Sequence, residues 1–328
     1  MSISTGSLIV LPNSRSIEYS ERTKYQSIDS TNYYGYVSRL LEMLRELGAI
    51  TFDADNRLIL SSFFTNNKPS AVSRLLGYAA EAIIVRECNQ SLEKNRKWAN
   101  YARRNRQERC PFKSVVRSIF YTPFLANPDD FIAVGTGFAS TQNGNYSKFY
   151  NPISDRDICW VSKGSTGRQL LTVEGVKQSR QRYSGLQVKV SCADNAQYVT
   201  NYFKKKKFYT LYPVVYFDLG NDFYKVRDNL INLDSSMVKP DTIFSNDVDY
   251  GNYSRADIVD MMLIRGKYVD ESMQEELLFY KHIFKKIISG KIDIHDLTNE
   301  NVLISLITDY VGHNLIRETP ILNVSVAA

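Results

Sequence analysis

The sequence GLQVKVS places chemically capable side chains on one face of a predicted strand. Its two valines alternate with Gln187, Lys189 and Ser191. This period of two sends the valines to one face and the polar groups to the other. A polar face on a strand inside a sheet indicates a cleft, because polar groups buried without partners are costly. The segment is therefore a candidate site that offers an amine, an amide and a hydroxyl.

Any metal chemistry in this chain has to rely on carboxylates. The four cysteines include no CxxC pair, so they form no zinc ribbon, and the three histidines all lie toward the C-terminus without metal-site spacing. These residues are Cys88, Cys110, Cys159, Cys192, His282, His295 and His313. Carboxylate oxygens favour Mg²⁺ or Mn²⁺, and such an ion polarises a phosphate and lowers the pKa of a bound water.

The composition is that of an ordinary globular protein. The 328 residues are 43% hydrophobic and 23% charged, which allows a sizeable core, and the formal net charge of +6 is too mild to indicate a polyanionic partner by itself. We expect a cytoplasmic protein with no membrane partner, because the N-terminus lacks a signal-peptide pattern and no run of about eighteen apolar residues occurs. No GxxxxGK[ST] loop occurs, so a nucleotide-driven motor would be a separate chain.

The elements that would position the candidate residues alternate between helical and strand patterns. A helix is predicted at 33–47, ending at Gly48, then a hairpin at 49–64 and one long helix at 71–102. Strand patterns follow at 130–138, 156–162, 168–176, 185–191 and 209–219, with an amphipathic helix at 192–207 before the last strand. Helical patterns return at 254–264, 271–290 and 300–315. We expect an N-terminal helix-and-hairpin region at 1–66, an α/β core at 67–235 and a helical C-terminal module at 236–328.

Four residues stand in a suggestive order within this core: Glu81 in the long helix, Asp157 at the start of DICWV, and Gln187 with Lys189 in GLQVKVS. Together with the order of a helix, consecutive strands, a second helix and a last strand, they resemble the PD-(D/E)xK nuclease superfamily. The resemblance covers residues 71–219, somewhat under half of the chain. It implies a restriction-endonuclease-like mixed sheet flanked by helices, with YPVVYF as its buried central strand.

The resemblance also implies roles for these residues. Asp157, Glu81 and Gln187 would bind Mg²⁺ or Mn²⁺, and Lys189 would orient the attacking water or offset charge developing on the phosphate. Two features depart from the family pattern. Glutamine stands at 187 where an acid is usual, which reduces the negative charge around the metal. The insertion between Asp157 and Gln187 is long, and it contains Glu174 as an alternative second acid.

Each of these residues also has a purely structural interpretation. Glu81 is compatible with a solvated or salt-bridged position on a helix. Asp157 is compatible with a turn residue beside Asp155 in SDRD, and Lys189 with an edge-strand lysine that opposes aggregation.

Residues 94–117 form a second pattern, in which nine basic residues face the single acid Glu108. Like charges at this density repel one another unless an anion binds, so we expect phosphate contacts; the alternative is a solvated helix face. The residues expected to bind nucleic acid are Lys97, Arg103, Arg104, Arg106 and Arg109, with Arg180 and Arg182 from the insertion before Gln187.

The leading hypothesis is a metal-dependent nuclease that cleaves phosphodiester bonds, with double-stranded DNA as the expected substrate. Restriction or anti-phage defence is the setting that the resemblance implies, and a homodimer would suit double-strand cleavage. The alternative is a catalytically inactive nuclease-fold protein that binds nucleic acid or recruits a partner such as a helicase or another ATPase. The sequence leaves open DNA against RNA and endonucleolytic against exonucleolytic cleavage.

Overall fold

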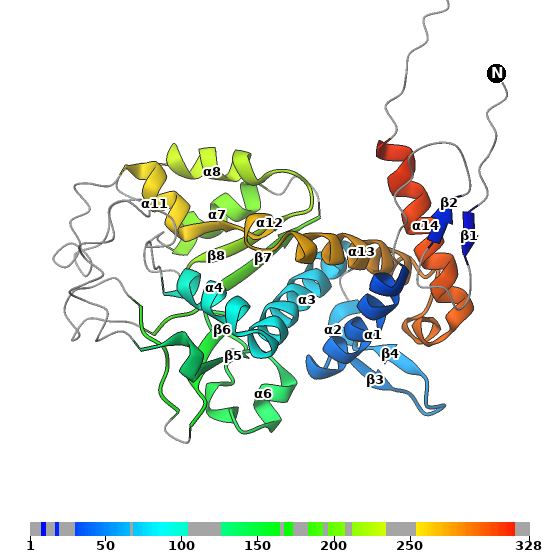
Figure 1. Cartoon of the computed structure of the whole chain (residues 1–328), viewed down its shortest axis with the longest axis horizontal. Helices are drawn as coiled ribbons and strands as arrows, with labels where there is room; N and C mark the ends of the chain where they lie inside the picture. The colour runs from blue at the N-terminus through cyan, green and yellow to red at the C-terminus, as the bar shows by residue number, and fades with distance from the viewer. Residues whose placement is uncertain are drawn as a thin grey trace, which may run out of the picture.

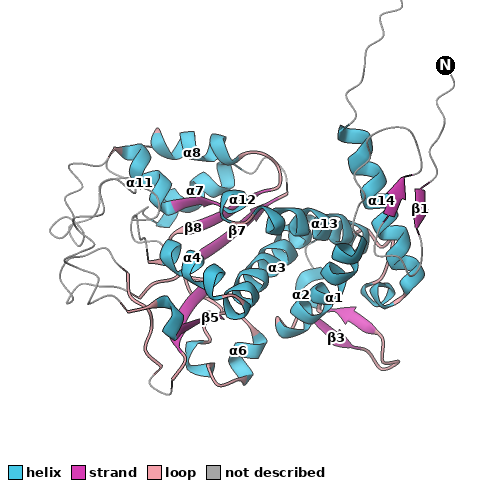
Figure 2. Cartoon of the chain, viewed as in Figure 1, coloured by secondary structure: helices cyan, strands magenta, loops and turns pink. Residues whose placement is uncertain are grey.

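The protein has a mixed α/β architecture in which helices flank small sheets (Figures 1 and 2). The computed structural model describes residues 8–10, 17–19, 30–65, 68–103, 126–164, 167–172, 183–192, 196–206, 212–233 and 254–318. Of the helices described, none has the length and apolar character that crossing a membrane requires.

The N-terminal part consists of two short hairpins and helix α1. Strand β1 (Leu8–Val10) pairs antiparallel with β2 (Ile17–Tyr19), and after α1 (Ser30–Glu46) strand β3 (Ile50–Phe52) pairs antiparallel with β4 (Leu58–Leu60), followed by the short α2 (Ser62–Thr65). Gly48 has φ +69° and ends α1 in the left-handed conformation that favours glycine. The predicted helix and hairpin are both confirmed.

The prediction of one helix across 71–102 is wrong, because the helix is interrupted at Ser91. Helix α3 (Lys68–Gln90) ends there and α4 (Leu92–Ala102) begins. Ser91 has an extended backbone, with φ −132° and ψ 121°, and its hydroxyl oxygen accepts the backbone N–H of Lys94 at 3.3 Å. A serine that caps a helix in this way competes with helix continuation, since its side chain satisfies an amide that the preceding turn would otherwise bind.

Two sheets follow (Figure 2). Strand β5 (Phe131–Gly135) pairs antiparallel with β6 (Ile158–Ser162), while β7 (Gln187–Ser191), β8 (Val214–Asp218) and β9 (Leu263–Arg265) form a parallel sheet with β8 in the middle. The backbone N–H of Leu186 donates to the carbonyl of Ile158 at 2.9 Å, which joins β6 to the start of β7. All five residues of β8 are buried, as predicted for a central strand.

Two expectations for the strands need correction. Within the predicted strand at 168–176, Gln169 and Leu171 form only isolated bridges, to Val161 and Tyr183, and residues 173–176 lie outside the described part of the chain. Strand β9 was not predicted, because its three residues directly follow helix α11 (Arg255–Met262) without a turn residue between them.

The remaining elements connect the sheets and complete the C-terminal part. They are η2 (Pro128–Asp130), α6 (Ala139–Asn143), η3 (Ser147–Phe149), α7 (Ala196–Lys206), α8 (Phe223–Ile231), α12 (Gly266–Val269), α13 (Glu271–Ile288), η6 (Ile294–Thr298) and α14 (Glu300–Glu318). One hydrophobic cluster extends from Val37 on α1 through α3 and β6 to Val311 on α14. This cluster includes residues from all three of the regions expected at 1–66, 67–235 and 236–328.

Aromatic residues from the two ends of the described chain pack together in this cluster. The ring centroid of Tyr33 on α1 lies 4.9 Å from that of Phe279 on α13, and Phe279 in turn lies 5.1 Å from Tyr310 on α14. The hydroxyl of Tyr280 donates to the backbone carbonyl of Tyr36 at 2.7 Å. Helices α1, α13 and α14 thus form one packed unit.

Candidate functional site

The Asp157 carboxylate lies where β6 and β7 meet. One of its oxygens, Oδ2, accepts two hydrogen bonds of 2.6 Å, from the side-chain amide of Gln187 and from the backbone N–H of Val188. The backbone carbonyl of Asp157 accepts the N–H of Thr136 at 2.8 Å, which anchors the residue to the end of β5. Its other carboxylate oxygen, Oδ1, accepts no hydrogen bond from the described residues. Asp157 therefore presents one oxygen to the site.

Both polar atoms of the Gln187 side-chain amide form hydrogen bonds. Its Nε2 donates to Asp157, and its Oε1 accepts the hydroxyl of Tyr202 on α7 at 3.2 Å. The ammonium of Lys189 lies 5.0 Å from the centroid of the Tyr202 ring, so the same tyrosine also contacts the candidate lysine. Gln187 and Lys189 share a strand face as the alternation predicts, and α7 covers that face.

Glu81 on α3 completes the group. Burial raises the pKa of Glu81 well above its usual value, the charge of Asp157 raises it further, and the charge of Lys189 opposes both. Burial also raises the pKa of Asp157, against the lowering effects of Lys189 and of the two hydrogen bonds to Oδ2. The two carboxyl groups are thus near enough to repel each other when ionised, with Lys189 as the compensating charge.

The four residues that the sequence places in a reaction centre are therefore brought together from α3, the start of β6, and β7. A divalent cation fits this donor set in charge, because it would relieve the repulsion between two buried carboxylates. No group of three or more acidic, histidine or cysteine ligands occurs among the described residues. Mg²⁺ commonly binds through only one or two carboxylates, with waters and substrate phosphates as its other ligands, so the pair of acids is a sufficient set.

Two tyrosines of the site were not predicted from the sequence. Tyr202 touches Gln187 and Lys189, and Tyr78 lies one turn before Glu81 on α3. Burial raises the pKa of Tyr78, and the charges of Glu81 and Asp157 add to that effect. The available signal was helical spacing, since residues 78 and 81 share one helix face. No comparable signal placed Tyr202, which meets β7 only through the tertiary fold.

The basic residues described in the stretch at 94–117 all contact other parts of the protein, which corrects the expectation for Arg103. This side chain is 4% exposed and donates to the backbone carbonyls of Leu171 at 3.1 Å and Ala126 at 2.9 Å. Burial lowers the pKa of Arg103 to about 10. A guanidinium enclosed in this way is not available to a phosphate backbone.

The other basic residues described in this stretch also have partners from distant segments. Lys94 pairs with Glu87 at 2.8 Å and Asp270 at 3.0 Å, and Arg96 pairs with Asp129. Lys97 is exposed, and its ammonium donates to the backbone carbonyl of Val269. Residues Arg104, Arg106, Arg109, Glu174, Arg180 and Arg182, also expected to bind nucleic acid or metal, lie outside the described part of the chain.

Comparison of the chain with protein-family models, with characterised proteins and with solved structures gave no significant match.

Proposed function

We propose that this protein is a metal-dependent nuclease that hydrolyses phosphodiester bonds of nucleic acid at the site formed by Asp157, Glu81 and Lys189. The observation that carries the proposal is the convergence of two carboxylates and one lysine, from three separate elements, beside the start of β7. We further propose that the α/β core is restriction-endonuclease-like, that DNA is the substrate, and that the activity serves restriction or anti-phage defence.

The residues would divide the work as follows. Asp157 and Glu81 would hold Mg²⁺ or Mn²⁺, which when bound supplies a polarised phosphate and an acidified water. Gln187 would keep the Asp157 carboxylate oriented through its 2.6 Å hydrogen bond to Oδ2. Lys189 would offset negative charge that develops on the phosphate. Tyr202 would keep Gln187 in place through its hydroxyl and limit the movement of Lys189 through its ring.

A second candidate function is nucleic-acid or partner binding without catalysis. The position of Gln187 favours it, because Asp157 and Tyr202 engage both ends of this amide, and its oxygen would have to share its two lone pairs between Tyr202 and a metal. Without Gln187 as a third ligand, the site would hold a metal through two carboxylates alone. A protein of this kind would show salt-sensitive binding of nucleic acid without cleavage.

Cleavage assays separate the two functions. Purified protein is incubated with supercoiled plasmid, linear DNA, single-stranded DNA and single-stranded RNA, each with Mg²⁺, with Mn²⁺ and with EDTA. The nuclease proposal predicts nicking or degradation of at least one substrate that stops in EDTA. Intact substrates under every condition would reject the nuclease and retain the binding function.

The raised pKa of Glu81 predicts a dependence of stability on pH that metal reverses. The unfolded chain loses the Glu81 proton near the ordinary value of 4.5, whereas the folded chain keeps it to higher pH. Without metal, the contribution of Glu81 to stability therefore falls as pH rises from 4.5 through the folded pKa. Metal competes with protons, so we expect Mg²⁺ to stabilise the protein more at about pH 8 than at about pH 5, by up to about 2.7 kcal/mol at free metal one hundred times its Kd.

Thermal unfolding in Mg²⁺ and in EDTA across this pH range measures the effect. Glu81→Gln should lose both the pH-dependent penalty and most of the stabilisation by metal. Glu275→Gln, a change at an exposed position on α13, is the matched control and should behave as the wild type. Equal stabilisation by Mg²⁺ in Glu81→Gln and in the wild type would remove Glu81 from the metal site.

A further inference from the structure

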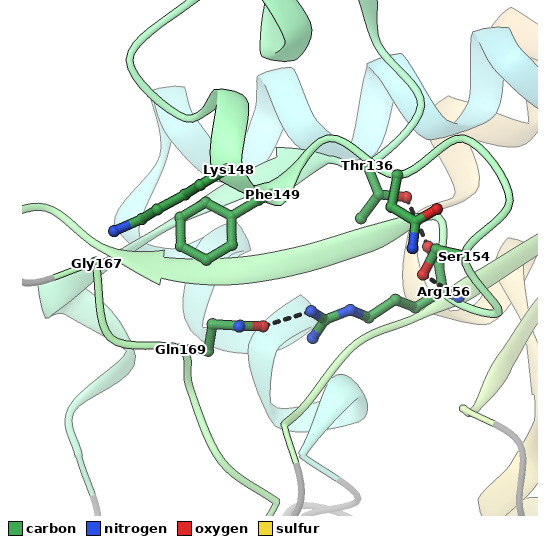
Figure 3. A pocket seen from close by; sticks show the side chains of 8 residues that line it. Thr136, Lys148, Phe149, Ser154, Arg156, Gly167 and Gln169 are labelled. Atoms are coloured by element: carbon green, nitrogen blue, oxygen red, sulfur yellow. Dashed lines mark hydrogen bonds between the residues drawn. The ribbon is translucent and has the colours of Figure 1, made fainter.

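A second polar pocket lies beside β6 and is separate from the carboxylates of the candidate reaction centre. Its volume is about 300 Å³, and it is lined by Lys148, Phe149, Arg156 and Gln169 among others (Figure 3). Figure 3 shows the Phe149 ring on one side of the pocket and Gln169, hydrogen-bonded to the Arg156 guanidinium, on the other. Lys148 extends past Phe149 toward Gly167.

The charge of this pocket is positive. None of its lining residues is acidic, and in the described part of the chain neither Lys148 nor Arg156 lies within ion-pair distance of a carboxylate. The Arg156 guanidinium donates to the backbone carbonyl of Ser184 at 3.1 Å and to the side-chain oxygen of Gln169. The ammonium of Lys148 lies 5.1 Å from the centroid of the Phe149 ring. Two cations with no counter-charge among the described residues, in one concave site, favour an anionic ligand.

The uncharged polar groups of the pocket are donors for the most part. Because the oxygen of Gln169 accepts from Arg156, the amide nitrogen of Gln169 remains for a ligand. Asn151 is arranged similarly, since its oxygen accepts the backbone N–H of Ile153 at 3.3 Å. The Ser154 hydroxyl oxygen accepts the N–H of Arg156 at 3.2 Å, which leaves its proton to donate. A lining rich in donors suits a ligand rich in acceptors, such as a phosphate.

Aromatic rings accompany the cations. Phe149 is half-buried and lines the pocket directly. The Arg156 guanidinium lies 5.9 Å from the centroid of the Tyr183 ring, and Tyr183 is 53% exposed. Any nucleobase can stack on such rings, while the acceptors of the base meet the amides of Gln169 and Asn151. The volume is at the lower end of ligand pockets, which run from roughly 300 Å³ upward, and suits one nucleotide unit.

We propose that this pocket binds one phosphate-bearing nucleotide unit, with its phosphate against Lys148 and Arg156 and its base against Phe149. The unit is either a free mononucleotide or one nucleotide of a strand. In the second case the pocket would hold a nucleotide near the scissile phosphate, because Arg156 directly precedes Asp157 in the chain, and this case alone rests on the proposed nuclease function.

Calorimetric titration in EDTA tests the pocket with thymidine 5′-monophosphate, inorganic phosphate and thymidine. We expect the monophosphate to bind and the uncharged nucleoside to bind at least tenfold more weakly, since a charge-assisted contact contributes roughly a factor of ten or more. Lys148→Gln should weaken the monophosphate by roughly tenfold, and Phe149→Leu should weaken the monophosphate but not inorganic phosphate. Lys148 is exposed, so its replacement leaves folding intact, which the melting temperature checks.

Lys291→Gln is the matched control, because it removes one exposed positive charge far away in the sequence, between α13 and η6. Equal affinity for thymidine and its monophosphate, or equal binding by Lys148→Gln and Lys291→Gln, would overturn the proposal. Competition by a short oligothymidylate identifies a strand as the source of the nucleotide, and failure to compete identifies the free mononucleotide. Asp157→Asn should retain nucleotide binding, so loss of cleavage and loss of this pocket are separate results.

Discussion

Replacing Asp157 by asparagine is expected to lower metal-dependent cleavage by at least about a hundredfold, the scale of losing a group that stabilises the transition state. At the junction of β6 and β7, Oδ2 of the Asp157 carboxylate accepts two hydrogen bonds, whereas Oδ1 accepts none from the described residues. Asparagine keeps the shape and one acceptor for Val188 but removes the charge that would hold the cation. Rates of plasmid nicking at saturating Mg²⁺ measure the loss.

Asp155→Asn is the matched control, because Asp155 is an exposed acid two residues away in the same turn. It should keep cleavage within a factor of about two, since removing an exposed charge typically changes little. Lys189→Met should lose cleavage as Asp157→Asn does, and this variant should still bind nucleic acid at low salt. Equal loss of activity in Asp155→Asn and Asp157→Asn would assign the effect to the turn and not to a metal ligand.

The second large expected effect concerns stability and the parallel sheet. Arg265 at the end of β9 makes two hydrogen bonds, of 2.8 and 3.2 Å, to the Asp218 carboxylate at the end of β8, and the Asp218 side chain is fully buried. The same guanidinium lies 4.8–5.3 Å from three ring centroids, those of Phe223, Tyr224 and Tyr268. Arg265→Met would leave the Asp218 charge buried without a partner, at a cost of about 3–5 kcal/mol.

Urea unfolding of three variants distinguishes this explanation from a simple loss of packing. Arg265→Met alone should be the least stable, and the double variant Asp218→Asn with Arg265→Met should recover part of the loss, because no unpaired charge remains. Arg265→Lys keeps the charge but loses the two-pronged geometry, so it should fall between them. If the double variant were as unstable as Arg265→Met, the ion pair would not be the source of the effect.

The sequence predicted the elements whose residues carry their own local pattern. Alternation identified β7, an apolar run identified β8, and the position of Gly48 marked the end of α1. The four candidate residues also lie close together. This could be predicted because helix and strand periodicity assign Glu81 and Lys189 to faces of their elements once the order of the elements is known. The restriction-endonuclease-like identity of the core and its chemistry stay predictions.

What the sequence did not predict depends on partners that lie far apart along the chain. The basic stretch appeared uncompensated because Asp129 and Asp270, which pair with Arg96 and Lys94, are not its neighbours in sequence. Strand β9 is defined by its parallel pairing with β8, and its three residues are too few to show strand alternation in the sequence. Tyr202 reaches Gln187 only after α7 has packed on the sheet.

The packing of α1 against α13 and α14 has a consequence for how this protein is made. The hydrogen bond from Tyr280 to Tyr36 spans 244 residues of sequence. At ribosomal rates of 5–20 residues per second, α1 therefore emerges roughly 12–50 s before the helix that covers its aromatic face. During that interval Tyr33 and Tyr36 are without their packing partners Phe279, Tyr280 and Tyr310, so this part of the core forms only after translation has reached the last helices.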